Sequence, residues 1–305
     1  MLMMQSRRQF LTTLSLAGAA VALPFRRVAA IESPPETTSV RLAKIPVICF
    51  APQYVCEALL RAEGFTDISY LDTTPLGLFK ELAPGKFDFA SNLSLDFITA
   101  IDAGVPITIL TGVHAGCYEL FAHGDIRGVA DLKGKSVGML GTTSLVATLA
   151  AYVGLNPTKD LTMINDPAAK PFEQFVGGKL DAYLAFPPAP QELHARKVGH
   201  VILRTAVDRP WSQYFCCTLA GNREFIARYP VATKRVIRAL LRAADLRASA
   251  PEQAAPLIVD GGFTENYDRA ADLEREPLRQ LARLRCRRQR PLLCSATERA
   301  RHDQA

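Results

Sequence analysis

The chain has 305 residues, of which 49% are hydrophobic, which is enough for one large domain or two medium-sized lobes with well-developed cores. Its net charge of +6 is uneven: four arginines before residue 28 contribute +4, and residues 275–305 hold nine arginines against three acids, which leaves −4 for residues 31–274. A slightly acidic body with no basic stripe excludes nucleic acid as the expected partner.

The first 30 residues have the pattern of an export signal. Arg7 and Arg8 precede the uncharged run 11–25, which is shorter than the about 20 apolar residues of a membrane-spanning helix. Paired arginines, a short apolar run and the small residues at 28–30 together indicate a twin-arginine signal peptide, cleaved after about Ala30. We therefore expect a periplasmic protein that engages the twin-arginine translocase, with an uncleaved, membrane-anchored form as the alternative.

Short β-rich runs alternate with helical runs from residue 39 to residue 110, as in a mostly parallel α/β sheet. We expect strands at 39–45, 67–71, 87–91 and 107–110, and helices at 52–63, 76–82 and 94–103. The turns fall on proline, glycine and asparagine, which interrupt regular structure. These residues predict one lobe built from βα units.

The same alternation continues along the rest of the body. We expect strands at 117–122, 136–140, 161–164, 182–186 and 201–205, and helices at 143–153, 171–175 and 190–197. An extended run at 215–221 then precedes helices at 223–228, 231–248 and 252–258. The pattern predicts a second α/β lobe of similar build, followed by helices that pack on the outside of a lobe.

Three motifs occur in a fixed order: DLKGKSVG at residues 131–138, GTTS at 141–144 and GGKLDAYLAFPP at 177–188. With the segments 48–63, 112–122 and 211–222, this ordered set resembles the periplasmic substrate-binding proteins of ABC importers. The resemblance is to the nitrate/sulfonate/taurine branch, which includes binders of thiamine-pyrimidine precursors, and it covers residues 38–265.

The resemblance implies a two-lobed periplasmic binding protein type II fold, with a hinge crossed twice and a small solute held in the cleft between the lobes. On this basis lobe one comprises residues 31–115 and 219–272, and lobe two comprises residues 116–218. It further implies a monomeric solute-binding component that delivers its solute to an ABC permease driven by an ATPase subunit.

Candidate ligand-binding residues lie where strands end and helices begin. In open α/β sheets, ligands sit beyond the carboxyl ends of the strands, where helix N-termini present unpaired N–H groups. The residues that offer hydroxyl, amide, backbone or aromatic groups at such places are Gln53, Tyr54, Ser91, Asn92, Ser94, Val113, His114, Gly141, Thr142, Thr143, Ser144, Phe186, Trp211 and Tyr214.

Each of these candidates has a structural alternative. The hydroxyls at 91–94 and 141–144 can bond an anionic or carbonyl group, but ordinary helix N-capping explains them equally well. Trp211 and Tyr214 can stack on a planar ligand or pack in the core, and a lone histidine such as His114 is more often structural. Few charged residues occupy these loops, so we expect a neutral, aromatic or weakly anionic solute.

No arrangement typical of catalysis or of a metal site is visible. The sequence has no nucleophile elbow, phosphate loop or histidine-rich cluster, and no two of its seven cysteines have the spacing of a zinc knuckle. We therefore expect no catalytic residue, metal or cofactor. The alternatives are an enzyme related to pyrimidine synthesis, for which Cys216, Cys217 and His114 are the only candidates, and a sensor that serves a receptor.

The end of the chain departs from the pattern of the resembling family. Residues 273–305 are rich in arginine, contain no aromatic residue and include Cys286 and Cys294. We interpret this segment as the product of a frameshift, which would truncate lobe one. The alternative is a genuine basic helix at 275–290.

Overall fold

The computed structural model describes residues 32–74, 77–141, 143–261 and 263. The expected signal peptide, Thr142 and the arginine-rich tail lie outside the described residues. All described helices and strands belong to the unit formed by residues 35–305.

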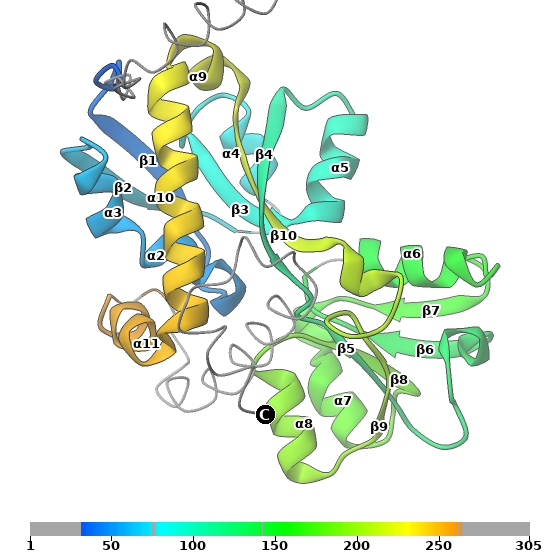
Figure 1. Cartoon of the computed structure of the whole chain (residues 1–305). Helices are drawn as coiled ribbons and strands as arrows, with labels where there is room; N and C mark the ends of the chain where they lie inside the picture. The colour runs from blue at the N-terminus through cyan, green and yellow to red at the C-terminus, as the bar shows by residue number, and fades with distance from the viewer. Residues whose placement is uncertain (1–31, 75–76, 142, 262, 264–305) are drawn as a thin grey trace, which may run out of the picture. The chain divides into compact units, whose positions relative to one another are not determined.

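The first sheet has five strands in the order β2-β1-β3-β10-β4 (Figure 1). In that order they span Asp67–Asp72, Ser39–Lys44, Phe89–Leu93, Phe215–Asn222 and Ile107–Ala115. β1 pairs in parallel with β2 and β3, whereas β10 is antiparallel to β3 and β4. Thus β1, β2, β3 and β4 share one direction, and β10 runs against them.

The second sheet repeats this plan with the order β7-β6-β8-β5-β9. Its strands span Leu161–Ile164, Lys135–Gly138, Ala182–Ala185, Glu119–Ala122 and His200–Arg204. β6 pairs in parallel with β7 and β8, and β5 is antiparallel to β8 and β9. Each sheet therefore contains a single reversed strand between two parallel neighbours, which confirms the predicted class of mostly parallel α/β sheets.

Helices flank both sheets. Those that follow strands of the first sheet are α2 (Ala51–Tyr54), α3 (Glu57–Ala62), α4 (Leu78–Leu82), α5 (Ser94–Asp102), α9 (Arg223–Arg228), α10 (Pro230–Ser249) and α11 (Pro251–Asp260). Those of the second sheet are α6 (Ser144–Tyr152), α7 (Pro171–Val176) and α8 (Ala189–Arg196). None of the helices in the described part of the chain is both long and apolar enough to cross a membrane.

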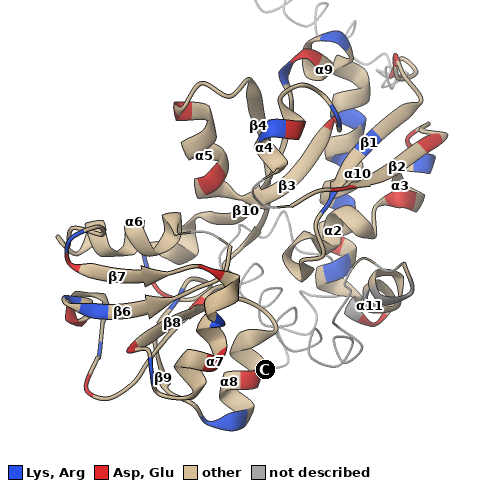
Figure 2. Ribbon diagram, turned by 180° about the vertical axis from the view of Figure 1, so that it is seen from behind, with Lys and Arg blue, Asp and Glu red and all other residues tan. Residues whose placement is uncertain are grey.

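The longest helix, α10, follows directly from its sequence pattern. Its buried residues recur every three or four positions, as in Val236, Ala239, Leu240 and Ala243, so one apolar face packs inward. Pro230 occupies the first turn, where its missing N–H costs nothing. The opposite face exposes mostly polar and charged residues, among them Lys234, Arg242 and Asp245. Figure 2 shows both charge signs mixed over the described elements.

The predicted continuous helix at 52–63 is wrong, because the chain forms a 3-10 turn at Ile48–Phe50 and then the separate helices α2 and α3. The break falls at Val55, whose backbone leaves the helical region with φ −90° and ψ 0°. Just before it, the Tyr54 hydroxyl bonds the backbone of Ile45. A tertiary contact with the residue that follows β1 therefore fixes the end of α2.

The chain leaves the first sheet after β4 and returns to it as β10. At the first crossing, Gly116 has φ +56°, and a Cβ atom there would lie 2.2 Å from the Cα atom of Ala206. Beside the second crossing, where the chain enters β10, a Cβ atom on Gly112 would lie 2.2 Å from the ring of Phe215. Real Cβ atoms do not approach other atoms so closely, so both crossings depend on glycine.

We expect Gly116→Ala to lower the free energy of unfolding by clearly more than Gly124→Ala does. Both glycines have similar positive φ values, +56° and +61°, which cost a residue with a side chain about 1–2 kcal/mol. Only at Gly116 does the added Cβ meet backbone, since nothing lies within 4 Å of it at Gly124. Urea unfolding followed by circular dichroism measures both losses, and equal losses would contradict the close approach at the crossing.

Candidate functional site

The candidates predicted in β3 and β4 lie deep in the first sheet. Ser91, Asn92, Val113 and His114 are all buried. In the strand register, Ser91 and Asn92 pair with residues of β10, and His114 pairs with Cys217. The structure therefore places these candidates on β3 and β4, with β10 between the two strands.

Gln53 and Tyr54 hold α2 against the sheet. The Gln53 amide donates to the Ala43 carbonyl at 2.5 Å and accepts from the Ser91 N–H at 3.0 Å. The Tyr54 hydroxyl bonds both backbone groups of Ile45, and burial raises its pKa. Both side chains are therefore placed in the core, with their polar atoms bonded to backbone.

Ser94 has a different role from the N-cap considered for it. It is the first residue of α5, and its neighbour Leu93 occupies the N-cap position without a side-chain bond to the helix. The Ser94 hydroxyl lies 2.8 Å from the Phe215 carbonyl and 3.0 Å from the Cys216 carbonyl. Ser94 therefore fastens the start of α5 to the start of β10.

The start of α6 approaches α5. The Ser144 hydroxyl donates to the Asp96 carboxylate at 2.5 Å, and this bond links helices that flank different sheets. Thr143 is exposed and caps no N–H group of α6 with its side chain. Gly141 has φ +95° and open space around its Cα atom. Gly141 and Thr143 at this helix start are therefore accessible to a solute.

The aromatic candidates divide into packed and exposed residues. Trp211 packs edge-on against Tyr152, with ring centroids 5.1 Å apart, and Phe186 lies 5.9 Å from Tyr118. Tyr214 is 63% exposed, just before β10. Of the three candidates, Tyr214 is thus the one whose ring faces solvent.

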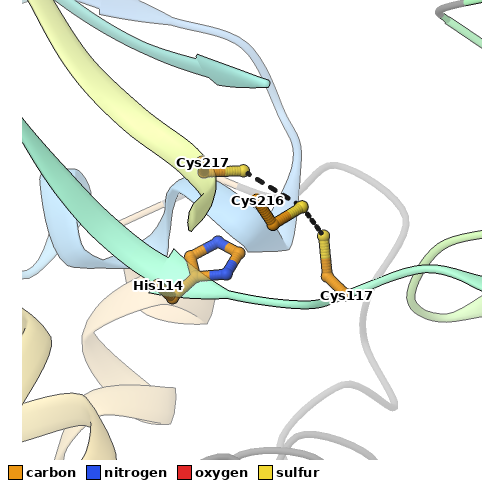
Figure 3. Close-up of side chains that lie close together, drawn as sticks. All are labelled: His114, Cys117, Cys216 and Cys217. Carbon is orange, nitrogen blue, oxygen red and sulfur yellow. Dashed lines mark hydrogen bonds between the residues drawn. The ribbon is translucent and has the colours of Figure 1, made fainter. Parts of the chain in front are cut away.

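The structure also brings His114, Cys216 and Cys217, the residues of the enzyme alternative, together with Cys117, which the sequence motifs did not indicate (Figure 3). His114 lies near the end of β4, Cys117 follows the first crossing, and Cys216 and Cys217 begin β10. One ligand atom from each residue lies within 4.8 Å of the others. Cys117 and Cys216 are 99 residues apart in sequence, yet their sulfur atoms are 2.7 Å apart. No local spacing signals such a group, because the strand register creates it.

Hydrogen bonds between the sulfur atoms of this group shift the pKa values of its cysteines. Burial opposes ionisation of Cys216, but hydrogen bonds from Cys117 and Cys217 outweigh it and lower its pKa to about 6. Burial and the bond to Cys216 raise the pKa of Cys117 well above its ordinary value. The hydrogen bond with Cys117 lowers the pKa of Cys217 as well. The arrangement therefore favours thiolate character on the paired cysteines of β10, and the thiolate is the form that binds metals.

The sequence profile of the NMT1/THI5-like family matches residues 67–254, so the chain belongs to this family. No curated protein matches the chain. Among solved structures, the periplasmic aliphatic sulphonate-binding protein SsuA from Escherichia coli has a TM-score of 0.64 at 19% identity, over 80% of this chain and 79% of that one.

Two further solved structures show the same fold. The alkanesulfonate-binding protein SsuA from Xanthomonas axonopodis pv. citri gives a TM-score of 0.60 at 18% identity, over 81% of this chain and 85% of that one. The periplasmic nitrate-binding protein NrtA from Synechocystis PCC 6803 gives a TM-score of 0.61 at 18% identity, over 76% of this chain and 68% of that one. The chain therefore has the two-lobed fold of periplasmic binding proteins, as its sequence resemblance implied.

We expect Gln53→Ala to lower the free energy of unfolding by about 2 kcal/mol, because it leaves the Ser91 N–H and the Ala43 carbonyl buried without their partner. Urea unfolding measures the loss. Gln213→Ala is the matched control, since Gln213 is exposed and surface changes stay within about 0.5 kcal/mol. A Gln53 variant as stable as the control would show that Gln53 does not support the sheet.

Proposed function

We propose that this protein is the solute-binding component of an ABC import system and acts in the periplasm as a monomer. The observation that carries the proposal is the pair of α/β sheets joined by two chain crossings, in a chain of the NMT1/THI5-like family. Structural neighbours with this fold are named as periplasmic sulfonate- and nitrate-binding proteins. A solute that contacts both lobes stabilises the closed form, which a permease and its ATPase subunit then recognise.

The solute proposed is a small organic or weakly anionic molecule. The start of α6 favours negative charge, because its backbone N–H groups carry the positive end of the helix dipole. The Asp96 carboxylate already lies beside Ser144 at this helix start, and it opposes a multiply charged anion. The Thr143 hydroxyl suits a single carbonyl or sulfonyl oxygen, because the Ser144 hydroxyl already donates its one proton to Asp96.

The protein is proposed to bind its solute rather than transform it. The structural neighbours named above are binding proteins. The enzyme alternative rests on Cys216, Cys217 and His114, and it requires chemical change in the bound solute. A receptor-linked sensor would bind solute in the same way but would not couple to import.

We expect one member of a panel of nitrate, short alkanesulfonates, taurine and aminopyrimidines to raise the melting temperature saturably. A solute that binds only the folded chain adds about 2.7 kcal/mol at a concentration of 100 Kd. Differential scanning fluorimetry measures the shift. Mass spectrometry of the released solute is expected to show an unchanged molecule, and a transformed one would support the enzyme alternative.

A pair of threonine variants tests the position of the site. Thr143→Ala removes a hydroxyl at the exposed start of α6 and is expected to weaken binding about tenfold, the effect of one hydrogen bond to a charged group. Thr162→Ala is the control, because Thr162 is an exposed residue of β7 away from that helix start. Equal affinities in the two variants would place the solute elsewhere.

We further propose that residues 1–30 direct export by the twin-arginine route. Replacing Arg7 and Arg8 by lysine is expected to leave the protein in the cytoplasm as a precursor, because the translocase recognises the arginine pair. Replacing Arg26 and Arg27 by lysine keeps the charge near the expected cleavage site and is the control. Cell fractionation and immunoblotting measure where each variant accumulates. Unchanged periplasmic accumulation of the variant at Arg7 and Arg8 would refute export by the twin-arginine route.

A further inference from the structure

Solute binding gives no role to the group formed by His114, Cys117, Cys216 and Cys217. Its four side chains come from both chain crossings, and His114 and the paired cysteines of β10 are buried. Each offers one ligand atom to the same small volume. Thiolate and imidazole ligands are the set that thiophilic cations prefer.

The hydrogen bonding of His114 leaves one ring nitrogen ready to bind a cation. Its Nε2 atom lies 3.0 Å from the Cys49 carbonyl, which can only accept, so Nε2 carries the proton and donates it. In the neutral ring, Nδ1 then carries a lone pair. Nδ1 is buried and has no hydrogen-bond partner among the described residues. A histidine that ligates a metal is oriented in the same way, with its other nitrogen bonded to a carbonyl.

The spacing of the ligand atoms suits a single ion. All four lie within 4.8 Å of one another. Around a tetrahedral Zn²⁺ with Zn–S distances of about 2.3 Å, the sulfur atoms lie about 3.8 Å apart. Cys117 and Cys216, whose sulfur atoms are 2.7 Å apart, would separate by about an ångström to reach this geometry. The side chains therefore need only local adjustment.

We propose that His114, Cys117, Cys216 and Cys217 form a binding site for one thiophilic divalent cation, with Zn²⁺ as the best match to three sulfur ligands and one nitrogen ligand. On binding, each of the three cysteines that is still a thiol releases its proton to solvent, so that all three bind as thiolates, and His114 coordinates through Nδ1 as the neutral ring. No electron transfer is involved.

Two surrounding groups support the site. Arg247 of α10 is buried and acts electrostatically on His114, so it supplies positive charge beside a complex whose three thiolates exceed the charge of the cation by one. Cys49, whose carbonyl bonds His114, is also buried. The ion would tie the segment after β4 to the start of β10 and so join the two crossings of the chain.

The test uses the full chain with Cys286 and Cys294 replaced by serine, reduced and handled without oxygen. Titration with Co²⁺ is expected to give the visible bands of tetrahedral thiolate coordination at one equivalent, and Zn²⁺ is expected to displace it. Zn²⁺ should also protect Cys117, Cys216 and Cys217 from alkylation, as read by mass spectrometry. This protection assay needs no change within the site and remains valid if site variants do not fold.

Site variants and a control complete the test. Cys216→Ser and His114→Ala are each expected to lower the affinity for Zn²⁺ at least tenfold. Cys56→Ser is the control: Cys56 is a buried thiol that bonds the Gln53 carbonyl outside the group, so its loss should leave affinity unchanged. Absence of stoichiometric Co²⁺ binding would overturn the proposal, as would equal loss of affinity in the control. A Cys117–Cys216 disulfide in the periplasmic protein, with no bound metal, would also overturn it.

Discussion

The insertion of β10 between β3 and β4 is the constraint on which the rest of the structure depends. Without β10, β3 and β4 would each present an unpaired edge in the middle of the first sheet, and buried backbone groups must find partners. β10 pairs with β3 from Cys217 to Gly221 and with β4 along nearly its whole length. The strand arrives only after the chain has built the complete second sheet, so the first sheet closes last in chain order.

The far end of β10 is anchored by a single asparagine. The Asn222 side chain donates to the carbonyls of Leu82 and Ala83 at 3.0 and 2.8 Å and accepts from the N–H of Phe225 at 2.8 Å. Its backbone N–H bonds the Asp88 carbonyl. One residue thus ends the strand, caps α9 and ties both to the region before β3. The position of β10 along its neighbours is fixed by these bonds, and with it the position of every residue at its start.

The first residues of β10 contribute both to the packing of the first sheet and to the proposed cation site. They accept the Ser94 hydroxyl from α5 and place two cysteines beside His114 and Cys117. The same segment is the second crossing between the sheets. A change in the relative position of the two sheets would therefore move the ligand atoms of the proposed cation site, and a bound cation would in turn resist that movement. Solute binding and cation binding would share this segment without sharing their main ligands.

The sequence by itself determined most of the elements and the fold class. Strand β7 coincides with the strand predicted at 161–164. The strand predicted at 67–71 ends one residue before the end of β2. Such patterns are local, since apolar periodicity and turn residues act over a few positions. The fold class followed because alternating strands and helices allow few arrangements. The sequence also showed that the hydroxyls at 91–94 and 141–144 could either cap a helix or bind a ligand. Only the structure could show which contacts they make.

Tertiary structure alone decided which residues meet. It broke the predicted helix at 52–63, because the Tyr54 hydroxyl bonds the backbone of Ile45 just after β1, and it placed Gln53 in the core. It also joined Cys117 to Cys216 across 99 residues. The physical reason is that these contacts depend on the register of β10, which is set by hydrogen bonds between segments far apart in the chain. No window of sequence short enough to show a pattern contains both partners.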